Sequence, residues 1–409
     1  MKKLFAVALG ILTAIGGFVD IGDLVTNALV GARFGLSLVW VVVVGVVGIC
    51  VFAEMSGRVA AVSGRATFDL IRERLGPRAG LANLLASMAV TFLTLTAEIG
   101  GVALALELAS DVNRYLWIPF VGAAVWLVLW RVKFAILENV FGLAGLALVV
   151  FAVALWKLGP DWGALATAAT HPGIPAQEDG FVYAYYAIGL FGAAMTPYEV
   201  FFFSSGGIEE GWTARDLGTM RANVFIGFPL GGLLSIAIAA CATVVLLPRG
   251  IEVDTLGQVG LPVAVAVGKL GLAFVLLGFF AATFGAACET GLSVGYSVAQ
   301  YFGWQWGKFV PPLRAARFHT MVLLSCVAAV GVLLTTVDPI MLTEYSVVFS
   351  AIALPLTYLP ILVVANDRTY MGKHANGRLA NVLGSIYLVI VVVASVAALP
   401  LMLVTKAGQ

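Results

Sequence analysis

Acidic side chains interrupt two long apolar stretches of the sequence. The first contains Asp20-Ile21-Gly22-Asp23, and the second contains Pro197 two residues before Glu199. If these stretches cross a membrane, each charged carboxylate near the bilayer centre costs about 2.5–3.5 kcal/mol, so three of them indicate a functional site. Glycine loosens a helix and proline removes a backbone donor, although either residue alone is also common as an ordinary kink. We predict helix breaks at Gly22 and Pro197, with the carboxylates beside them.

The residue types at the two breaks predict a site for a hard metal cation. Asp20, Asp23 and Glu199 supply carboxylates, and Thr196 supplies a hydroxyl. Each break also frees backbone carbonyls, which a membrane tolerates only where they line a cavity. Hard cations such as Mg²⁺ and Mn²⁺ prefer these oxygen ligands, whereas softer metals prefer sulfur or imidazole. The side chain of Met195, the nearest sulfur, would point about 100° away from that of Thr196 in a helix. The only histidines, which are expected in loops or at a helix end, are His171, His319 and His374.

Further acids in the apolar stretches indicate a path for protons or ions. Carboxylates that share a site repel one another, so one of them would carry a proton when no cation is bound. Glu98 and Glu289 lie in the middle of apolar stretches and are expected to face the protein interior. We predict that Glu98 takes part in the ion or proton path, with a structural hydrogen-bonding role as the alternative. For Glu289 the two roles are equally supported.

Composition identifies the membrane as the solvent of this chain. Of its 409 residues 61% are hydrophobic and 11% are charged, and the mean hydropathy is +1.03. A soluble domain has roughly 25% charged residues and could not hide so much apolar surface from water. The net charge of +1, without a separate basic run, argues against nucleic acid as a partner. The cysteines fall in apolar stretches, where core packing is expected, at Cys50, Cys241, Cys288 and Cys326.

Eleven apolar stretches are long enough to cross a bilayer. The first follows Met1-Lys2-Lys3 and lacks a cleavage site, so we expect a retained helix rather than a signal peptide. The predicted spans cover residues 4–30, 36–62, 81–109, 115–130, 134–156, 181–206, 221–247, 267–301, 317–336, 340–365 and 380–403.

The distribution of basic residues predicts the orientation in the cell membrane. With the N-terminus in the cytoplasm, only six of the 23 lysines and arginines fall on outside connections. These six are Arg33, Arg114, Lys157, Arg249, Lys269 and Lys406. The remaining 17 fall on inside connections, as the positive-inside rule requires. The same count places the C-terminus outside, makes residues 157–180 an extracellular loop and makes residues 207–220 a short cytoplasmic connection.

The interrupted stretches are the first and the sixth spans. Interrupted helices at corresponding positions of two halves predict a five-plus-five inverted repeat, with the binding site at the midplane between the breaks. We therefore expect an all-α integral membrane protein with a single transporter domain. Its repeats would cover about residues 4–156 and 181–365, and an additional helix would cover about residues 380–403.

Several motifs together resemble the Nramp family of divalent-metal transporters over most of the chain. The first break resembles the family's Asp-Pro-Gly-Asn, and residues 192–199 resemble its Gly-Ala-x-x-Met-Pro-His-Asn. Other matches are Arg33-Phe34-Gly35, Leu38-Val39-Trp40, Ala97-Glu98, Ala365-Asn366-Asp367-Arg368, Met371-Gly372, Asn376-Gly377-Arg378 and Asn381. The resemblance implies the LeuT-type fold and a metal bound between helices one and six. It also implies that Asp20 is the acidic ligand, that Asp23 replaces an asparagine, and that Ala193 offers a backbone carbonyl. Glu98 corresponds to the acid of the family's proton pathway.

The departures from the family motif concern the metal and the proton. The family's methionine, which is thought to favour transition metals, is Thr196 here, and its histidine, which is tied to proton movement, is Tyr198. Its following asparagine is Glu199, and a glutamine of helix ten in some members is Val347. This chain has lost the thioether and gained carboxylates, and the Nramp-related magnesium transporters differ from the rest of the family in a similar direction. Those transporters are thought to work without strong proton coupling.

These observations predict a secondary transporter of divalent cations that favours Mg²⁺, Mn²⁺ or both, without a cofactor. The runner-up is a proton-coupled Mn²⁺/Fe²⁺ importer. An amino-acid transporter of the same fold is less favoured, because Asp20, Asp23 and Glu199 would repel a substrate carboxylate. An ion channel is disfavoured by the broken helices, which point to alternating access. The sequence contains none of the zinc, nucleophile or phosphate-loop motifs that would indicate an enzyme.

Overall fold

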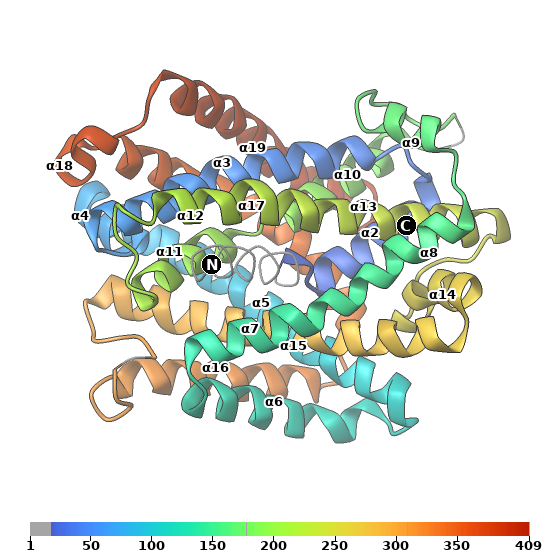
Figure 1. The fold of residues 1–409 in the computed structure, drawn as a ribbon, viewed down its shortest axis with the longest axis horizontal. Helices are drawn as coiled ribbons and strands as arrows, with labels where there is room; N and C mark the ends of the chain where they lie inside the picture. Colours follow the sequence, from blue (N-terminus) through green and yellow to red (C-terminus); the bar gives the residue numbers. More distant parts are fainter. Residues whose placement is uncertain (1–17, 177, 309, 409) are drawn as a thin grey trace.

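The computed structural model describes residues 18–176, 178–308 and 310–408. Within these ranges all regular secondary structure is helical (Figure 1). Nine helical stretches of the described residues are long and apolar enough to cross a membrane. Residues 4–17 of the first predicted span lie outside the described ranges. The N-terminus, which was predicted to be cytoplasmic, also lies outside them.

Within the described residues, each predicted span corresponds to one helix or to consecutive helices. The single helices are α2 (Ile21–Phe34), α3 (Val39–Ser63), α5 (Pro77–Ser110), α6 (Arg114–Arg131), α15 (Lys269–Phe302), α16 (Ala316–Leu333), α17 (Pro339–Asn366) and α19 (Arg378–Val404). The others are composite: α7 (Phe134–Gly145) with η1 (Leu146–Val149) and α8 (Val150–Leu158), α10 (Gly180–Ala194) with α11 (Pro197–Glu209), and α12 (Leu217–Ala222) with η2 (Asn223–Gly227) and α13 (Phe228–Val245).

Several connections that were expected to be loops contain short helices. These are α4 (Thr67–Leu75), α9 (Trp162–Ala168), η3 (Leu247–Arg249), α14 (Leu256–Val267), α18 (Arg368–Met371) and η4 (Gly372–His374). Helix α9 lies inside the predicted 157–180 loop, where the Asp161 side chain accepts from the amide of Ala164 and caps the helix. At α14, Thr255 and Gln258 form a capping box. Local capping, which hydropathy does not measure, starts both helices.

The first break lies slightly earlier than predicted. Phe18 is helical, Val19 and Asp20 are not, and α2 begins at Ile21 with Asp20 as its N-cap. Gly22 is therefore not at the break but in the first turn of α2. Its small size matters instead, because a Cβ at Gly22 would lie 2.9 Å from Oδ1 of Asp20 and 3.1 Å from Cγ1 of Val347. The glycine lets α17 and the Asp20 carboxylate approach α2.

The second break has the predicted proline at its edge. Helix α10 ends at Ala194, Met195 and Thr196 are non-helical, and Pro197 is the first residue of α11. Proline suits this position because its fixed φ matches the helix and the amide it lacks would be unpaired there. In an unbroken helix the carbonyl of Ala193 would accept from the amide of residue 197. Proline has no amide N–H, so this carbonyl has no regular helical donor.

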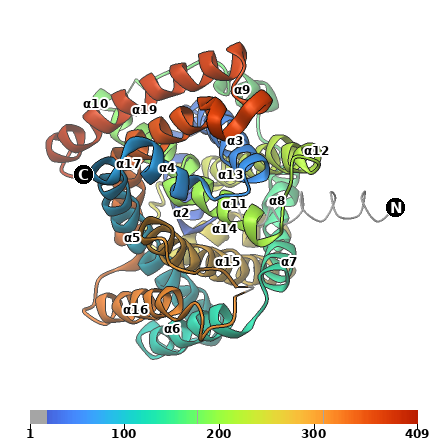
Figure 2. The same ribbon diagram turned by 90° about the vertical axis from the view of Figure 1, so that its left-hand side faces the viewer.

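The two broken helices lie in the middle of the bundle. Viewed end-on in Figure 2, α2 and α11 are surrounded by α3, α5, α13, α15 and α17, while α19 lies at one edge and α6 and α16 at the opposite edge. A separate cluster of buried side chains joins α5, α6, α15 and α16, with Val102, Val125 and Leu292 among its members. The inner helices are thereby shielded, and the breaks lie where a membrane protein can keep polar groups.

The connections alternate between the two ends of the bundle. Helices α4, α12 and α18 lie at the left end in Figure 1, and α9 and α14 lie at the right end. Arg33, just before the end of α2, donates to the carbonyl of Gly408 over 2.8 Å, so the C-terminal residues lie at the end where α2 finishes. This alternation agrees with the predicted order of the spans, whereas the side facing the cytoplasm stays a prediction.

Candidate metal-binding site

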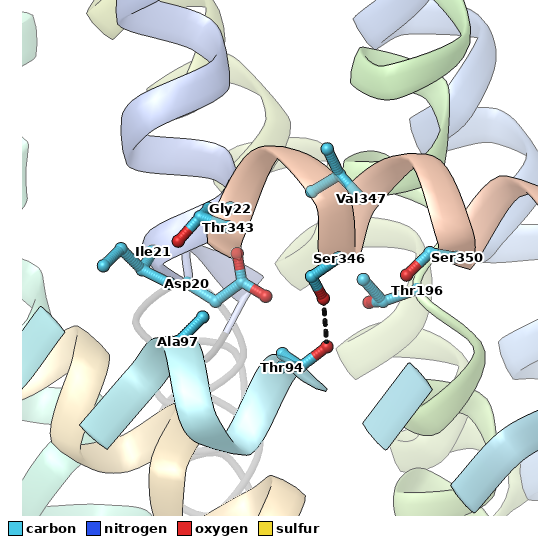
Figure 3. Close-up of a pocket in the computed structure, with 10 residues that line it drawn as sticks. All are labelled: Asp20, Ile21, Gly22, Thr94, Ala97, Thr196, Thr343, Ser346, Val347 and Ser350. Atoms are coloured by element: carbon cyan, nitrogen blue, oxygen red, sulfur yellow. Dashed lines mark hydrogen bonds between the residues drawn. The ribbon is translucent and has the colours of Figure 1, made fainter. Parts of the chain in front are cut away.

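A small cavity lies between the breaks, α5 and α17. Its volume is about 10 Å³, which is about the space of one water molecule. It is lined by Asp20, Ile21, Gly22, Thr94, Ala97, Thr196, Thr343, Ser346, Val347 and Ser350 (Figure 3). Asp20 comes from the first break and Thr196 from the second, so the structure brings these two predicted ligands to one place.

Asp20 is the carboxylate of this cavity, and it is only 3% exposed. Its Oδ1 accepts from the backbone amide of Asp23 over 2.9 Å. Its Oδ2 accepts from the hydroxyl of Tyr198 over 3.2 Å. Because Asp20 caps α2 and Tyr198 lies in the first turn of α11, this carboxylate joins the N-terminal ends of both half-helices. The positive ends of the helix dipoles favour a negative charge there.

Thr196 and Glu199 interact at the start of α11. The Thr196 hydroxyl donates to Oε2 of Glu199 over 3.3 Å. Thr196 lines the cavity, whereas Glu199 does not. The predicted carboxylate at position 199 therefore lies one hydrogen bond away from the cavity, behind the threonine.

Glu98 lies beside the first break and is completely buried. Its Oε1 accepts from the backbone amide of Ile21 over 3.1 Å, which satisfies one of the free N–H groups at the start of α2. Its Oε2 has no hydrogen-bond partner among the described residues. The Oε1 atom of Glu98 thus has the structural hydrogen-bonding role that was the alternative prediction. The Oε2 atom stays available for a proton or a cation.

Asp23 points away from the cavity. Its Oδ1 accepts from Ser235 of α13 over 3.3 Å and from the Asn27 side chain over 3.2 Å. The residue is buried against α13 and does not line the cavity. The joint role of Asp20, Asp23 and Glu199 at one ion stays a prediction: Asp20 lines the cavity, whereas the Asp23 carboxylate is hydrogen-bonded to Ser235 and Asn27. Among the described residues no three acidic, histidine or cysteine side chains converge as metal ligands.

Among the residues that the structure describes, no basic side chain forms a salt bridge with the acids around the breaks. Glu289, half-buried on α15, lies near enough to Asp20, Glu98 and Glu199 for their charges to interact. Within the described ranges, the salt bridges of lysine and arginine all involve other carboxylates. Buried carboxylates need a proton, a cation or hydrogen bonds to offset the loss of water. The region is therefore suited to bind cations and unsuited to bind anions.

Hydroxyl groups complete the cavity, and the sequence analysis missed most of them. Thr343, Ser346 and Ser350 occupy one face of α17 at helical spacing, and Thr94 faces them from α5. The hydroxyls of Thr94 and Ser346 are 2.9 Å apart, as the dashed line in Figure 3 shows. The Ser350 hydroxyl is buried without a partner among the described residues. The repeated spacing of these hydroxyls in an apolar span was the signal that could have identified them.

The remaining predicted residues differ in their relation to the cavity. Met195 does not line it: a Cβ at Gly48 of α3 would lie 2.6 Å from the Met195 sulfur, so this side chain packs against α3. Val347 does line it, at the place predicted for a residue of helix ten. Ala193 is buried, and its side chain packs in a small cluster that includes Val347. The lining of the cavity consequently contains oxygen donors and no sulfur.

Comparison with known sequences identifies the family. The family model "Natural resistance-associated macrophage protein-like" (Nramp) matches residues 10–400. The protein "Divalent metal cation transporter MntH" of Aeromonas hydrophila is 26% identical over 388 residues, covering 92% of this chain and 91% of the relative. The protein of the same name from Pectobacterium carotovorum is 26% identical over 384 residues, covering 92% and 89%.

Solved structures show the same fold. The manganese transporter of Eremococcus coleocola, in complex with an aromatic bis-isothiourea substituted compound, is similar with a TM-score of 0.69 at 19% identity, covering 95% of this chain and 85% of that one. Mhp1, a nucleobase-cation-symport-1 family transporter, has a TM-score of 0.62 at 16% identity, covering 97% and 92%. These likenesses confirm an all-helical, multi-pass membrane protein with the LeuT-type fold. The chain belongs to the Nramp family of divalent metal cation transporters, which are not enzymes.

Proposed function

We propose that this protein carries a divalent metal cation through the membrane at the cavity between its two helix breaks. The observation that carries this proposal is the buried Asp20 carboxylate, which faces Thr196 across a hydroxyl-lined cavity and has no basic partner among the described residues. We propose Asp20, Thr196 and the Ala193 carbonyl as direct ligands. Asp23 and Glu199 would act from a greater distance, by adding negative charge.

We propose Mn²⁺ as the principal ion. The similar Eremococcus coleocola protein is named a manganese transporter, and the similar curated proteins are named divalent metal cation transporters. Carboxylate, carbonyl and hydroxyl oxygens suit Mn²⁺. The cavity of about 10 Å³ has space for about one water, whereas Mg²⁺ gives up its water reluctantly and usually keeps several. The names of the similar proteins and the small volume of the cavity support the runner-up prediction, a Mn²⁺/Fe²⁺ importer, over a preference for Mg²⁺.

Mg²⁺ is the second candidate, because the cavity lacks sulfur. The Met195 thioether packs against α3, and Thr196 offers a hydroxyl instead. If the cavity widens when it opens, its hydroxyls could hold the waters of a partly hydrated Mg²⁺. A likeness to the magnesium-transporting branch of the family would rest on this feature alone.

We propose that the transport mechanism is alternating access between two inverted repeats. The repeats would cover about residues 4–156 and 181–365, with α19 added after them, and the breaks would occupy corresponding positions. The N-terminus would be cytoplasmic and the C-terminus outside, as the distribution of lysine and arginine favours.

We also propose that protons accompany the metal. The Oε2 atom of Glu98 is buried without a hydrogen-bond partner in the described part of the chain, and Glu289 lies near enough to interact with both Glu98 and Asp20. Tyr198, which donates to Asp20, would link these acids to the cavity. A proton on this group of acids would offset their charge when no metal is present, and the arrival of a metal would change where that proton is held.

The decisive experiment is transport into liposomes that contain the purified protein. Uptake of Mn²⁺, Fe²⁺, Mg²⁺ and Ca²⁺ would be measured together with the internal pH. We expect Mn²⁺ to enter fastest and the lumen to acidify in proportion. Asp20→Asn should lower Mn²⁺ uptake at least about 100-fold, because the variant loses the charged ligand. The matched control Asp111→Asn, in an exposed connection, should transport normally. Metal entry without acidification would contradict the coupling, and equal uptake by Asp20→Asn would contradict the site.

Substitution of Thr196 tests the basis of ion selection. Thr196→Met adds a thioether and should increase Cd²⁺ transport relative to Mg²⁺, because sulfur prefers soft ions. Thr196→Val removes only the hydroxyl, so it separates the gain of sulfur from the loss of the Glu199 hydrogen bond. Thr335→Met, in an exposed connection, is the control. Unchanged selectivity in Thr196→Met would show that this side chain is not a ligand.

A further inference from the structure

A second cavity, which shares no lining residue with the first, lies at the end of the bundle that carries α4, α12 and α18. Its volume is about 460 Å³, and it lies between α3, η2, the connection before α19 and the first turns of α19. The walls are of two kinds. Charged and polar side chains come from Glu54, Arg58, Arg221, Lys373 and His374. Apolar side chains come from Val51, Met55, Phe225, Leu379 and Leu383.

The charged wall has an excess of positive charge. Glu54 accepts from Arg58 and from Arg221, in both cases over 3.0 Å, so one carboxylate serves two guanidinium groups. Arg58 is buried and is also held by the His374 carbonyl and the Asn376 side chain. The exposed Lys373 ammonium has no hydrogen bond or ion pair among the described residues. Three cations and one anion leave two positive charges facing the cavity, with Lys373 and the half-exposed Arg221 accessible.

The apolar wall continues into an exposed apolar surface. Phe225 is 52% exposed and Leu379 is 73% exposed, although both are large apolar residues. Further along α19, Val382, Ile386 and Val389 are also exposed, at a spacing that gives one face of the helix. Helix α19 lies at the edge of the bundle in Figure 2. The cavity therefore has basic groups on one wall and an apolar wall that is continuous with the exposed apolar face of α19.

We propose that this cavity binds one anionic phospholipid. The phosphate would lie against Lys373 and Arg221, and an acyl chain would lie along Phe225, Leu379 and Leu383. The charge arrangement favours an anionic over a zwitterionic lipid, because the ammonium of a zwitterionic headgroup would meet a wall that carries three cations and one anion. This end of the bundle is the one predicted to be cytoplasmic, and basic pockets between helices on that side are suited to anionic headgroups. The site is separate from the metal cavity and does not depend on which ion is transported.

The test is native mass spectrometry of the purified full-length chain after delipidation. Phosphatidylglycerol or phosphatidylcholine is added back at equal concentration, and bound lipid is counted. We expect one phosphatidylglycerol to bind at least about fivefold more tightly than phosphatidylcholine. Lys373→Gln should weaken phosphatidylglycerol binding about fivefold, the order of effect of one basic residue at a membrane surface. Leu379→Asn should weaken it by shortening the apolar wall.

The matched control is Arg78→Gln, which removes an exposed charge at the same end of the bundle but outside the cavity. This variant should bind phosphatidylglycerol like the wild type, and thermal melting should confirm that all three variants are folded. Equal binding of the two lipids would overturn the proposal, as would an equal loss in Lys373→Gln and Arg78→Gln. Displacement of phosphatidylglycerol by millimolar inorganic phosphate would also overturn it, because the site would then recognise phosphate without the lipid.

Discussion

The hydroxyl of Tyr198 donates to Oδ2 of Asp20 over 3.2 Å, and this contact joins the starts of two half-helices that are separated by 178 residues. Both residues are buried. A hydrogen bond to a charged group in such a place is typically stronger than one between neutral groups. The contact therefore orients the carboxylate that lines the proposed metal cavity, and it links the two elements that would move in the proposed alternating-access mechanism.

Removal of this hydroxyl should slow transport without abolishing it. Tyr198→Phe keeps the ring and deletes the donor, so Asp20 stays in place but is less well oriented. We expect Mn²⁺ uptake into liposomes to fall about tenfold, which corresponds to a loss of about 1.4 kcal/mol. Tyr387→Phe is the matched control, because it deletes a hydroxyl that donates to Val44 over 2.9 Å, away from the cavity. Comparable losses in both variants would mean that only general stability has been changed.

Gly22 should be intolerant of even one methyl group. In Gly22→Ala the new Cβ would lie 2.9 Å from the Asp20 carboxylate and 3.1 Å from Val347. We expect weaker Mn²⁺ binding by isothermal titration calorimetry, because the carboxylate is displaced. The double variant Gly22→Ala/Val347→Ala should recover part of the affinity, since it removes the second clash. Gly331→Ala, which has no neighbouring atom within 4 Å of the new Cβ, should bind normally.

The Ser350 hydroxyl should contribute to transport and not to folding. It is buried without a hydrogen-bond partner among the described residues, so Ser350→Ala removes an unsatisfied group and should leave the melting temperature unchanged or slightly higher. If the hydroxyl contacts the ion or one of its waters, the KM for Mn²⁺ should rise severalfold. The control Ser395→Ala should show the reverse pattern, because Ser395 donates to Ile352 over 2.8 Å and lies outside the cavity. An unchanged KM in Ser350→Ala would exclude a role in ion binding.

Lys308 should make stability depend on pH above neutrality. It lies in the connection between α15 and α16, where its ammonium donates to the carbonyls of Val128 and Leu129. Burial lowers the pKa of Lys308 from 10.5 to about 8. Between these values the unfolded chain binds the proton and the folded chain releases it, so stability should rise as the pH increases from about 8 to 10.5.

The pH dependence can be checked by thermal melting of the protein in detergent micelles. Lys308→Met should remove the rise in stability above pH 8, because the variant has no group to titrate there. Lys133→Met, at an exposed position, should keep the rise. A rise that persists unchanged in Lys308→Met would assign it to another residue.

Local sequence was sufficient to predict where the two interrupted helices lie. The carboxylate at position 20 and the proline at position 197 are costly in a membrane unless a cavity surrounds them, so residue type alone indicated the breaks. The first break was predicted at Gly22 but lies at Asp20. The Asp20 side chain caps α2, so Gly22 is part of the helix. Hydropathy predicted the spans but not α9 or α14, which begin at caps.

The sequence by itself determined that the chain lies in a membrane, that two of its helices are broken and that oxygen groups surround the breaks, since these depend on hydrophobicity and local backbone chemistry. Only the tertiary structure decided which oxygens meet. Asp20 and Thr196 share a cavity, whereas Asp23 turns to Ser235 and Glu199 lies behind Thr196. Ser346 and Ser350 join from α17, more than 320 residues after Asp20. Side-chain direction depends on the rotation of each helix and on its neighbours, and no short stretch of sequence contains that information.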